Sequence, residues 1–182
     1  MFAPLPQELD LWRAVRLGAA FAGSATLAQL PRLAAAVVGA DGPARYTLAF
    51  ERDAARQAVA LGQVAMDLRL RCERCMGEVG LSLELPIALA LVHAASDSDR
   101  LGLDQVPAVA DQYEALPVGD EPINPLNLIE DELLLALPLA PIHEVGECQA
   151  ALPPDPTDST QAGALDEKKN PFAVLAALKS KG

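Results

Sequence analysis

Hydrophobic and polar side chains alternate along much of the first half of the chain. In the longest run, between residues 79 and 91, seven apolar side chains occupy every second position. Shorter alternating runs cover residues 46–50 and 64–72. Strict alternation is typical of a strand with one buried face. The pattern therefore predicts an antiparallel meander of three strands at Tyr46–Arg52, Val59–Cys72 and Val79–His93.

Two other segments carry apolar residues at helical spacing. The first is Leu27–Val38, and because proline fits only the first turn of a helix, we expect this helix to begin just before Pro31. The second is Pro125–Leu137, which has a leucine-rich face and an acidic patch at Glu130–Glu132. With a short strand at Phe21–Thr26, these elements predict an α+β fold. Its core would be a twisted antiparallel β-sheet (a meander) packed against two or three helices.

Composition separates one folded region from a tail. Residues 1–149 hold the predicted sheet and helices, and we expect them to form a single α+β domain that includes a long acidic connector at Ala94–Asn124. Residues 150–169 contain three prolines and few bulky side chains, which predicts a disordered linker. Residues 170–182 are predicted to form a short terminal helix that docks on a partner. Its candidate contacts are Asn170, Pro171, Phe172, Leu175 and Leu178.

Charge is distributed unevenly. The chain has 14 basic and 25 acidic residues, a net charge of −11. Nearly half of the acidic residues lie between Ala94 and Glu147, where Arg100 is the single base. An acidic section of this kind repels phosphate and attracts basic partners. A generally basic RNA-binding domain is therefore excluded, and an aromatic content of 4% argues against a surface built from rows of stacking rings.

Three cysteines, an odd number, fit a reducing compartment better than a framework of disulfides. No stretch reaches the length of uncharged apolar sequence that a membrane span needs. We therefore expect a cytoplasmic protein with no membrane partner.

One group of residues has the chemistry of a metal site. Cys72 and Cys75 form a Cys-x-x-Cys pair at a predicted turn between strands, and His143 and Cys148 follow the second predicted helix. Three thiolates and one imidazole can complete a tetrahedral zinc site. Because the gap from Cys75 to His143 is not a zinc-finger spacing, two alternatives remain: inert, partly buried thiols, or a redox pair.

A small basic group lies beside these cysteines and consists of Arg69, Arg71 and Arg74. These side chains could contact RNA phosphates. The alternative is an ordinary solvated strand face that neighbouring acids partly neutralise. The chain displays no glycine-rich phosphate loop, no Ser/His/Asp arrangement and no cluster of metal-binding aspartates, so we do not expect an enzyme.

Three segments together resemble a known family: CERCMGEVGLSLELP, IEDELLLALPLAPIHEVGEC and the C-terminal NPFAVLAALKSK. They are similar, in the same order, to the YceD family, the large ribosomal RNA subunit accumulation proteins of bacteria and plastids. The resemblance implies a non-enzymatic cytoplasmic factor for the accumulation or maturation of 23S ribosomal RNA. The family pattern that it implies includes Cys72, Cys75, His143 and Cys148 together, which strengthens the expectation of one structural Zn²⁺.

The partners implied are ribosomal precursor particles or basic ribosomal and processing proteins, with contact to 23S ribosomal RNA limited to the arginine group and the lysine-bearing tail. Two other functions remain open. One is a protein-interaction scaffold that makes no RNA contact, and the other is a thiol-dependent redox regulator.

Overall fold

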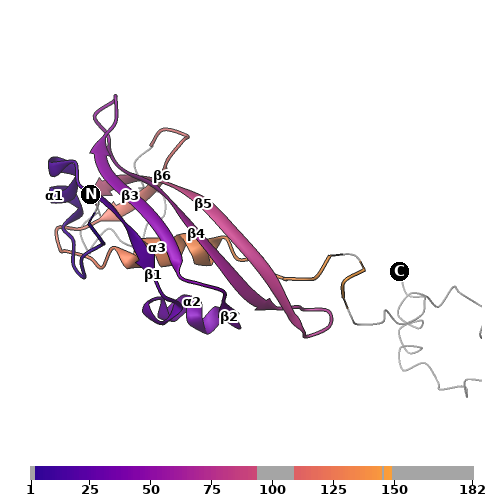
Figure 1. Ribbon diagram of the computed structural model, residues 1–182. Coiled ribbons are helices and arrows are strands. Elements are labelled where there is room, and N and C mark those ends of the chain that lie inside the picture. The colour runs from indigo at the N-terminus through magenta and orange to yellow at the C-terminus, as the bar shows by residue number, and fades with distance from the viewer. Residues whose placement is uncertain (1–2, 94–108, 145, 149–182) are drawn as a thin grey trace, which may run out of the picture. The chain divides into compact units, whose positions relative to one another are not determined.

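The computed structural model describes residues 3–93, 109–144 and 146–148 (Figure 1). The predicted linker at 150–169 and the predicted docking segment at 170–182 lie outside these residues. The helical elements are α1 (Leu11–Leu17), the 3₁₀ turn η1 (Leu27–Gln29), α2 (Pro31–Ala36) and α3 (Leu126–Leu135). The strands are β1 (Ala20–Ala25), β2 (Gly39–Ala40), β3 (Ala44–Arg52), β4 (Ala58–Arg71), β5 (Glu78–His93) and β6 (Glu114–Val118).

The strands of the described part form one open sheet in the order β1-β3-β4-β5-β6, with β2 paired to the end of β4. The predicted meander of β3, β4 and β5 is confirmed, and its neighbours pair antiparallel in the continuous registers Arg45↔Ala65 to Arg52↔Ala58 and Val59↔Ala90 to Arg71↔Glu78. The short strand predicted near Phe21 is β1, which adds to the free edge of β3. The α+β class is therefore confirmed.

The sheet is mixed, however, and the prediction of a wholly antiparallel sheet was wrong at one edge. Strand β6 lies inside the segment predicted to be a connector and pairs parallel with the last five residues of β5. Its sequence, EALPV, is short and contains a proline, so it lacks the alternation that identified the other strands. A parallel neighbour also requires a long crossover, and the residues between β5 and β6 supply one.

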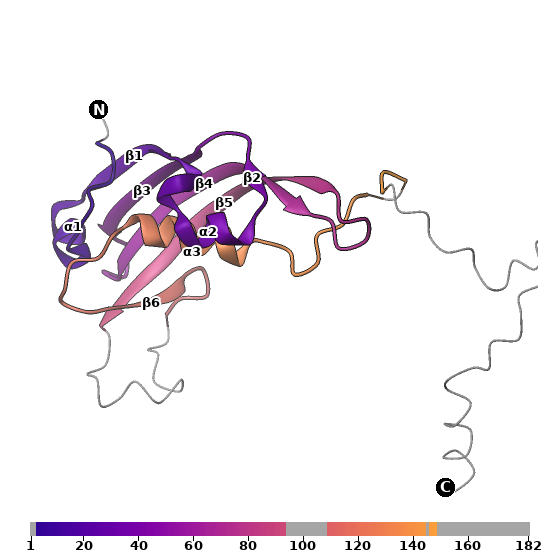
Figure 2. The same cartoon turned by 90° about the horizontal axis from the view of Figure 1, so that it is seen from below.

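The buried core lies between one face of the sheet and the helices. Phe50, Met66 and Ile87 face inward from three adjacent strands and are at most 2% exposed. Leu33 of α2 and Ile129 of α3 close this layer and are fully buried. Figure 2, seen from below, shows α2 and α3 together across one face of the sheet. The predicted helices are present, although α2 ends at Ala36 because the next residues turn to pair with β4, where the Val38 N–H donates to the Arg69 carbonyl.

A buried carboxylate joins the two helices. Glu130 of α3 is 2% exposed and accepts hydrogen bonds from the backbone N–H groups of Arg32 and Leu33, in the first turn of α2, at 2.7 and 3.1 Å. The Arg32 guanidinium completes the contact at 2.8 Å. Glu130 therefore caps a helix that has no side-chain cap of its own.

The β4–β5 hairpin is longer than the rest of the sheet and projects beyond it (Figure 1). Strand β3 pairs with β4 only up to Ala65, so beyond that point β4 is held by β5 and by the two-residue strand β2. The tip of this hairpin carries the predicted metal-binding cysteines.

Candidate metal centre

The tip of the hairpin is a tight turn that starts at the first cysteine. Cys72 is fully buried, and its N–H donates to the Gly77 carbonyl while its own carbonyl accepts from the Met76 N–H at 2.9 Å. Met76 takes a positive φ of 62°, a conformation that glycine adopts more readily. This turn holds Cys75, two residues before Gly77, on the same side of the hairpin as Cys72.

The chain after α3 returns to this tip. The Glu73 N–H donates to the Pro141 carbonyl at 2.8 Å, which fixes the returning segment against the turn. Two residues later, His143 places Nε2 at 2.9 Å from the Glu78 carbonyl oxygen at the start of β5. Residues separated by more than 60 positions in the sequence therefore meet at one point.

The four predicted ligands form one cluster. The ligand atoms of Cys72, Cys75, His143 and Cys148 all lie within 4.8 Å of one another. The Sγ atoms of Cys72 and Cys148 are 3.9 Å apart, and Cys75 Sγ lies 3.4 Å from His143 Nδ1. In a tetrahedral zinc site, bonds of about 2.0–2.3 Å place two sulfurs about 3.8 Å apart and a sulfur about 3.6 Å from a nitrogen. The cluster therefore has the size and the donor set that zinc requires.

The hydrogen bond on the far side of the imidazole fixes its tautomer. A backbone carbonyl can only accept, so the Nε2 of His143 carries a hydrogen and donates it to Glu78. In the neutral ring Nδ1 is then free of hydrogen and faces Cys75. Metal-bound histidines commonly donate their second nitrogen to such an outer partner, which orients the ring. Sequence patterns carry no signal for this partner because it is a main-chain atom.

The surroundings of Cys72 favour its thiolate form. Burial alone raises the pKa of this thiol, but backbone N–H groups of Cys75, His143 and Arg74, together with the His143 ring, lower it overall to about 5. The hydrogen bond with Cys72, followed by that with the Glu78 carbonyl, raises the pKa of His143. A thiolate is the form of cysteine that binds metal. The Cys72 thiolate thus favours a cation at the cluster, and a bound metal would take the place of the proton that these contacts favour on His143.

A closed set of four protein ligands indicates a structural metal rather than a catalytic one, which would keep a position open for water or substrate. When bound, the ion would tie the hairpin tip to the segment that follows α3. The competing redox interpretation requires a Cys-x-x-Cys pair at the start of a helix, whereas strands β4 and β5 flank this one.

The predicted RNA-contacting arginines lie beside this cluster but differ in their surroundings. Arg69 forms ion pairs with Asp41 at 3.1 Å and with Glu78 at 3.2 Å, so its charge is largely neutralised. Arg71 at the end of β4 and Arg74 in the turn are exposed. The five predicted docking residues, Asn170, Pro171, Phe172, Leu175 and Leu178, lie outside the described residues.

These features define a class: an α+β protein in which a long β-hairpin carries at its tip a Cys₃His cluster that could hold a metal ion. The model of one family, the large ribosomal RNA subunit accumulation protein YceD, matches residues 61–179. A protein of Haemophilus influenzae with that same name is 32% identical over 177 residues, which are 97% of each chain. The chain therefore belongs to the YceD family.

No solved structure matches the chain. In the described part of the protein, no helix is long and apolar enough to cross a membrane.

Proposed function

We propose that this protein is a non-enzymatic, cytoplasmic factor for the accumulation of 23S ribosomal RNA and the biogenesis of the large ribosomal subunit. The observation that carries this proposal is its likeness, over almost its full length, to a protein named for the accumulation of large-subunit ribosomal RNA. The metal cluster supports a binding role rather than catalysis, because all four coordination positions would be filled by the chain itself.

We further propose that one structural Zn²⁺ shapes the hairpin tip into a contact surface. Three apolar side chains near the cluster are more than half exposed: Met76 at 59%, Leu139 at 105% and Ile142 at 52%. Exposed Arg71 and Arg74 lie beside them. A rigid surface with apolar and cationic groups suits ribosomal precursor particles, which present both protein and RNA.

Co-sedimentation tests the proposed function. Tagged full-length protein should sediment with precursors of the large subunit, and less so after chelation of the metal. RNase treatment of the particles separates RNA-mediated from protein-mediated association. Protein that stays at the top of the gradient in every condition would contradict a role on these particles.

A second candidate is a protein-interaction scaffold without RNA contact. It is favoured by the ion pairs of Arg69 and by the acidic section of the chain, both of which reduce attraction to phosphate. Retention of basic proteins from RNase-treated extract, with no affinity for RNA alone, would favour the scaffold.

A further inference from the structure

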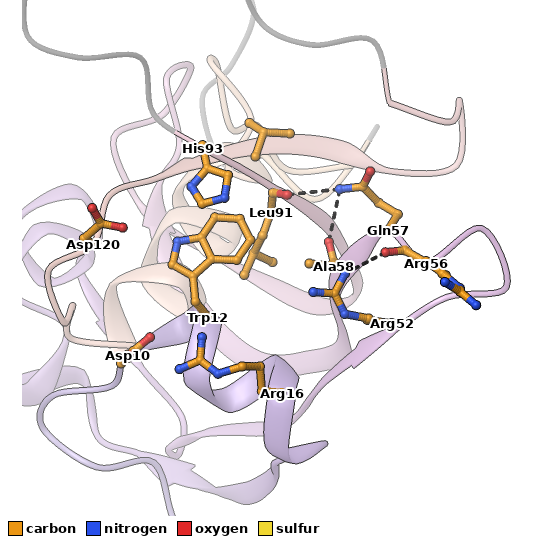
Figure 3. Close-up of a pocket in the computed structure, with 11 residues that line it drawn as sticks. Asp10, Trp12, Arg16, Arg52, Arg56, Gln57, Ala58, Leu91, His93 and Asp120 are labelled. Carbon is orange, nitrogen blue, oxygen red and sulfur yellow. Dashed lines mark hydrogen bonds between the residues drawn. The ribbon is translucent and has the colours of Figure 1, made fainter.

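A second polar site lies at the end of the sheet opposite to the hairpin tip. It is an open cavity of about 650 Å³ between α1, the β3–β4 turn, the end of β5 and the residue that follows β6 by two positions (Figure 3). Strand β4 starts at this cavity with Ala58 and ends at the metal cluster with Arg71. At about 3.3 Å per residue, the two sites are about 40 Å apart.

Three arginines line this cavity, and none of them has an acidic partner in the part of the chain that the structure describes. Arg16 comes from α1, Arg52 from the end of β3 and Arg56 from the turn that follows, and all three are exposed. Among the described residues, none of these guanidinium groups lies within 4.0 Å of a carboxylate. Arg52 instead donates to the Arg56 carbonyl at 2.8 Å, which holds the two residues together. In a chain with a net charge of −11, such a group favours an anionic ligand.

Two stacked rings stand beside the arginines. Trp12 of α1 and His93, the last residue of β5, lie with ring centroids 4.1 Å apart and planes 17° from parallel. The indole N–H donates to the Gly119 carbonyl at 3.1 Å, so the stack is fixed in orientation. His93 is exposed, so its ring is accessible to a ligand. A prepared aromatic stack is a surface on which a nucleobase stacks, whatever its identity.

The backbone at Arg56 takes a left-handed conformation that residues other than glycine rarely adopt. Its φ is 65°, in the left-handed region, at the position of a hairpin loop where glycine is usual. The turn is closed without help from this side chain: the Arg56 N–H donates to the Asp53 carbonyl, and the Asp53 carboxylate accepts from the Gln57 N–H. An arginine at this position brings a guanidinium group to the cavity, where a glycine would leave none.

Two carboxylates also line the cavity and restrict what it can hold. Asp10 caps α1 by accepting from the Arg13 N–H at 2.8 Å. Asp120 lies on the side of the Trp12–His93 stack away from Arg52 and Arg56 (Figure 3). A carboxylate repels phosphate but accepts hydrogen bonds from hydroxyl and amino groups. The cavity therefore has a cationic side at Arg52 and Arg56 and, across the ring stack, a carboxylate at Asp120 that suits hydrogen-bond donors.

We propose that this cavity binds a nucleotide unit of single-stranded RNA. The base would stack on the Trp12–His93 pair, the flanking phosphates would contact Arg16, Arg52 and Arg56, and Asp120 would accept from a ribose hydroxyl or a base amino group. This inference rests on the proposed function for the choice of RNA over a free nucleotide. It places the RNA contact far from the arginines at the hairpin tip.

The sole tryptophan of the chain, Trp12, provides a direct readout. Full-length protein is titrated with single-stranded RNA of mixed sequence, about ten nucleotides long, a typical site size. RNA should quench the tryptophan fluorescence, with the affinity falling as salt rises. Three phosphate contacts on a single strand predict a slope of log K against log salt of about −2. AMP and duplex RNA of the same sequence are titrated in parallel and should bind much more weakly.

Variants separate this cavity from other basic surfaces. Arg16→Ala, Arg52→Ala and Arg56→Ala should each flatten the salt slope by about 0.7. Trp12→Ala, followed with labelled RNA, should weaken binding by roughly 5- to 150-fold, the range for one lost stacking contact. Arg13→Ala is the matched control, because Arg13 is exposed on the same helix and does not line the cavity. It should retain the affinity of the unchanged protein.

The Arg56→Gly variant tests whether a loss of RNA affinity comes from the missing side chain or from loss of folding. This change relieves the positive φ, so the Tm should hold or rise while RNA affinity falls. A Tm that holds together with unchanged RNA affinity would overturn the role of Arg56. The inference as a whole would be overturned if RNA left the tryptophan fluorescence unchanged, or if AMP bound as tightly as RNA.

The outcomes also distinguish this inference from the proposed function. If binding were lost in an Arg71→Ala, Arg74→Ala double variant but kept in all three cavity variants, RNA would bind at the hairpin tip and the cavity assignment would be wrong. Co-sedimentation with large-subunit precursors tests the function independently. If the cavity variants kept both their sedimentation with the precursors and their affinity for RNA, the cavity assignment would be wrong. The proposed function would still stand.

Discussion

At the scale of single residues, Glu130 is the clearest case of a charged side chain buried for a structural purpose. Burial raises the pKa of its carboxyl, but hydrogen bonds from the Leu33 N–H and from Arg32 outweigh burial and hold the pKa below the usual 4.5. The ionised form is therefore favoured by folding. The sequence predicted only an acidic patch at Glu130–Glu132, because no pattern in the chain reveals that α2 begins against Glu130.

We expect Glu130→Ala to destabilise the fold by about 1–3 kcal/mol for the buried Leu33 N–H that loses its acceptor. Glu130→Gln is the matched control, because its amide oxygen can still accept from that N–H and only the charge is lost. Urea unfolding of both variants measures the difference. Equal stability of the alanine variant and the unchanged protein would show that the cap contributes nothing.

The same carboxyl predicts the pH dependence of stability. Since its pKa is lower in the folded state than in the unfolded state, its contribution is complete above about pH 4.5 and is lost as the pH falls through the folded value. The free energy of unfolding of the unchanged protein should therefore exceed that of Glu130→Gln at neutral pH and converge toward it in acid. A constant difference between pH 7 and pH 3 would contradict this linkage.

Substitution of a single residue, Cys75, tests whether the cluster binds zinc. If zinc is bound, freshly prepared reduced protein should contain one equivalent by metal analysis, and Cys75→Ser should lower both the zinc content and the Tm. Chelation should destabilise the unchanged protein to a similar extent and add nothing in the variant. Well under one equivalent of zinc, together with a Cys75→Ser variant of unchanged Tm, would support three inert thiols.

At the scale of elements, the close approach of β3 and β4 depends on a residue without a side chain. Gly62 lies opposite Leu48, and a Cβ atom there would collide with the Thr47 carbonyl oxygen. Gly80 of β5 is also in a strand, but nothing lies within 4 Å of the Cβ that it would gain. The two glycines therefore form a natural pair for comparison.

We expect Gly62→Ala to destabilise the protein by about 1–3 kcal/mol through overpacking. Gly80→Ala should stay within about 0.5 kcal/mol of the unchanged protein, as is usual for exposed positions. Thermal unfolding followed by circular dichroism measures both. Similar melting of the two variants would mean that the strands can separate to accommodate a methyl group.

The strands differed in how clearly the sequence predicted them. The alternation that marks β3, β4 and β5 exists because one face of each is buried, and this requirement is local to each strand. Strand β6 has five residues, and its place is set by β5, which lies more than 20 positions earlier. Alternation also overstated the burial of β5: its first half, from Glu78 to Pro86, is exposed or half-buried because the tip projects past the helices.

At the scale of the whole molecule, the two candidate sites also differed in how well the sequence predicted them. The Cys₃His cluster could be predicted because cysteine and histidine are rare in the chain and have few other roles. The cavity beside Trp12 could not, since arginine and aspartate are common and only the folded sheet brings α1 next to the end of β5. Nothing in the sequence indicated a role for His93, because its stacking partner Trp12 lies 81 positions away.

The unequal lengths of the strands have a consequence for how the molecule opens. Beyond Ala65, β4 is paired only with β5 and with two residues of β2, and among the described residues β5 has no strand on its other side until Leu89. Backbone amides near the tip should therefore exchange with deuterium through local opening, long before those of the central sheet. Chelation should accelerate exchange in residues 68–80 and leave residues 44–52 unchanged, as mass spectrometry of peptides would show. The hairpin tip would then become ordered only after the metal binds, later than the central sheet to which it is attached.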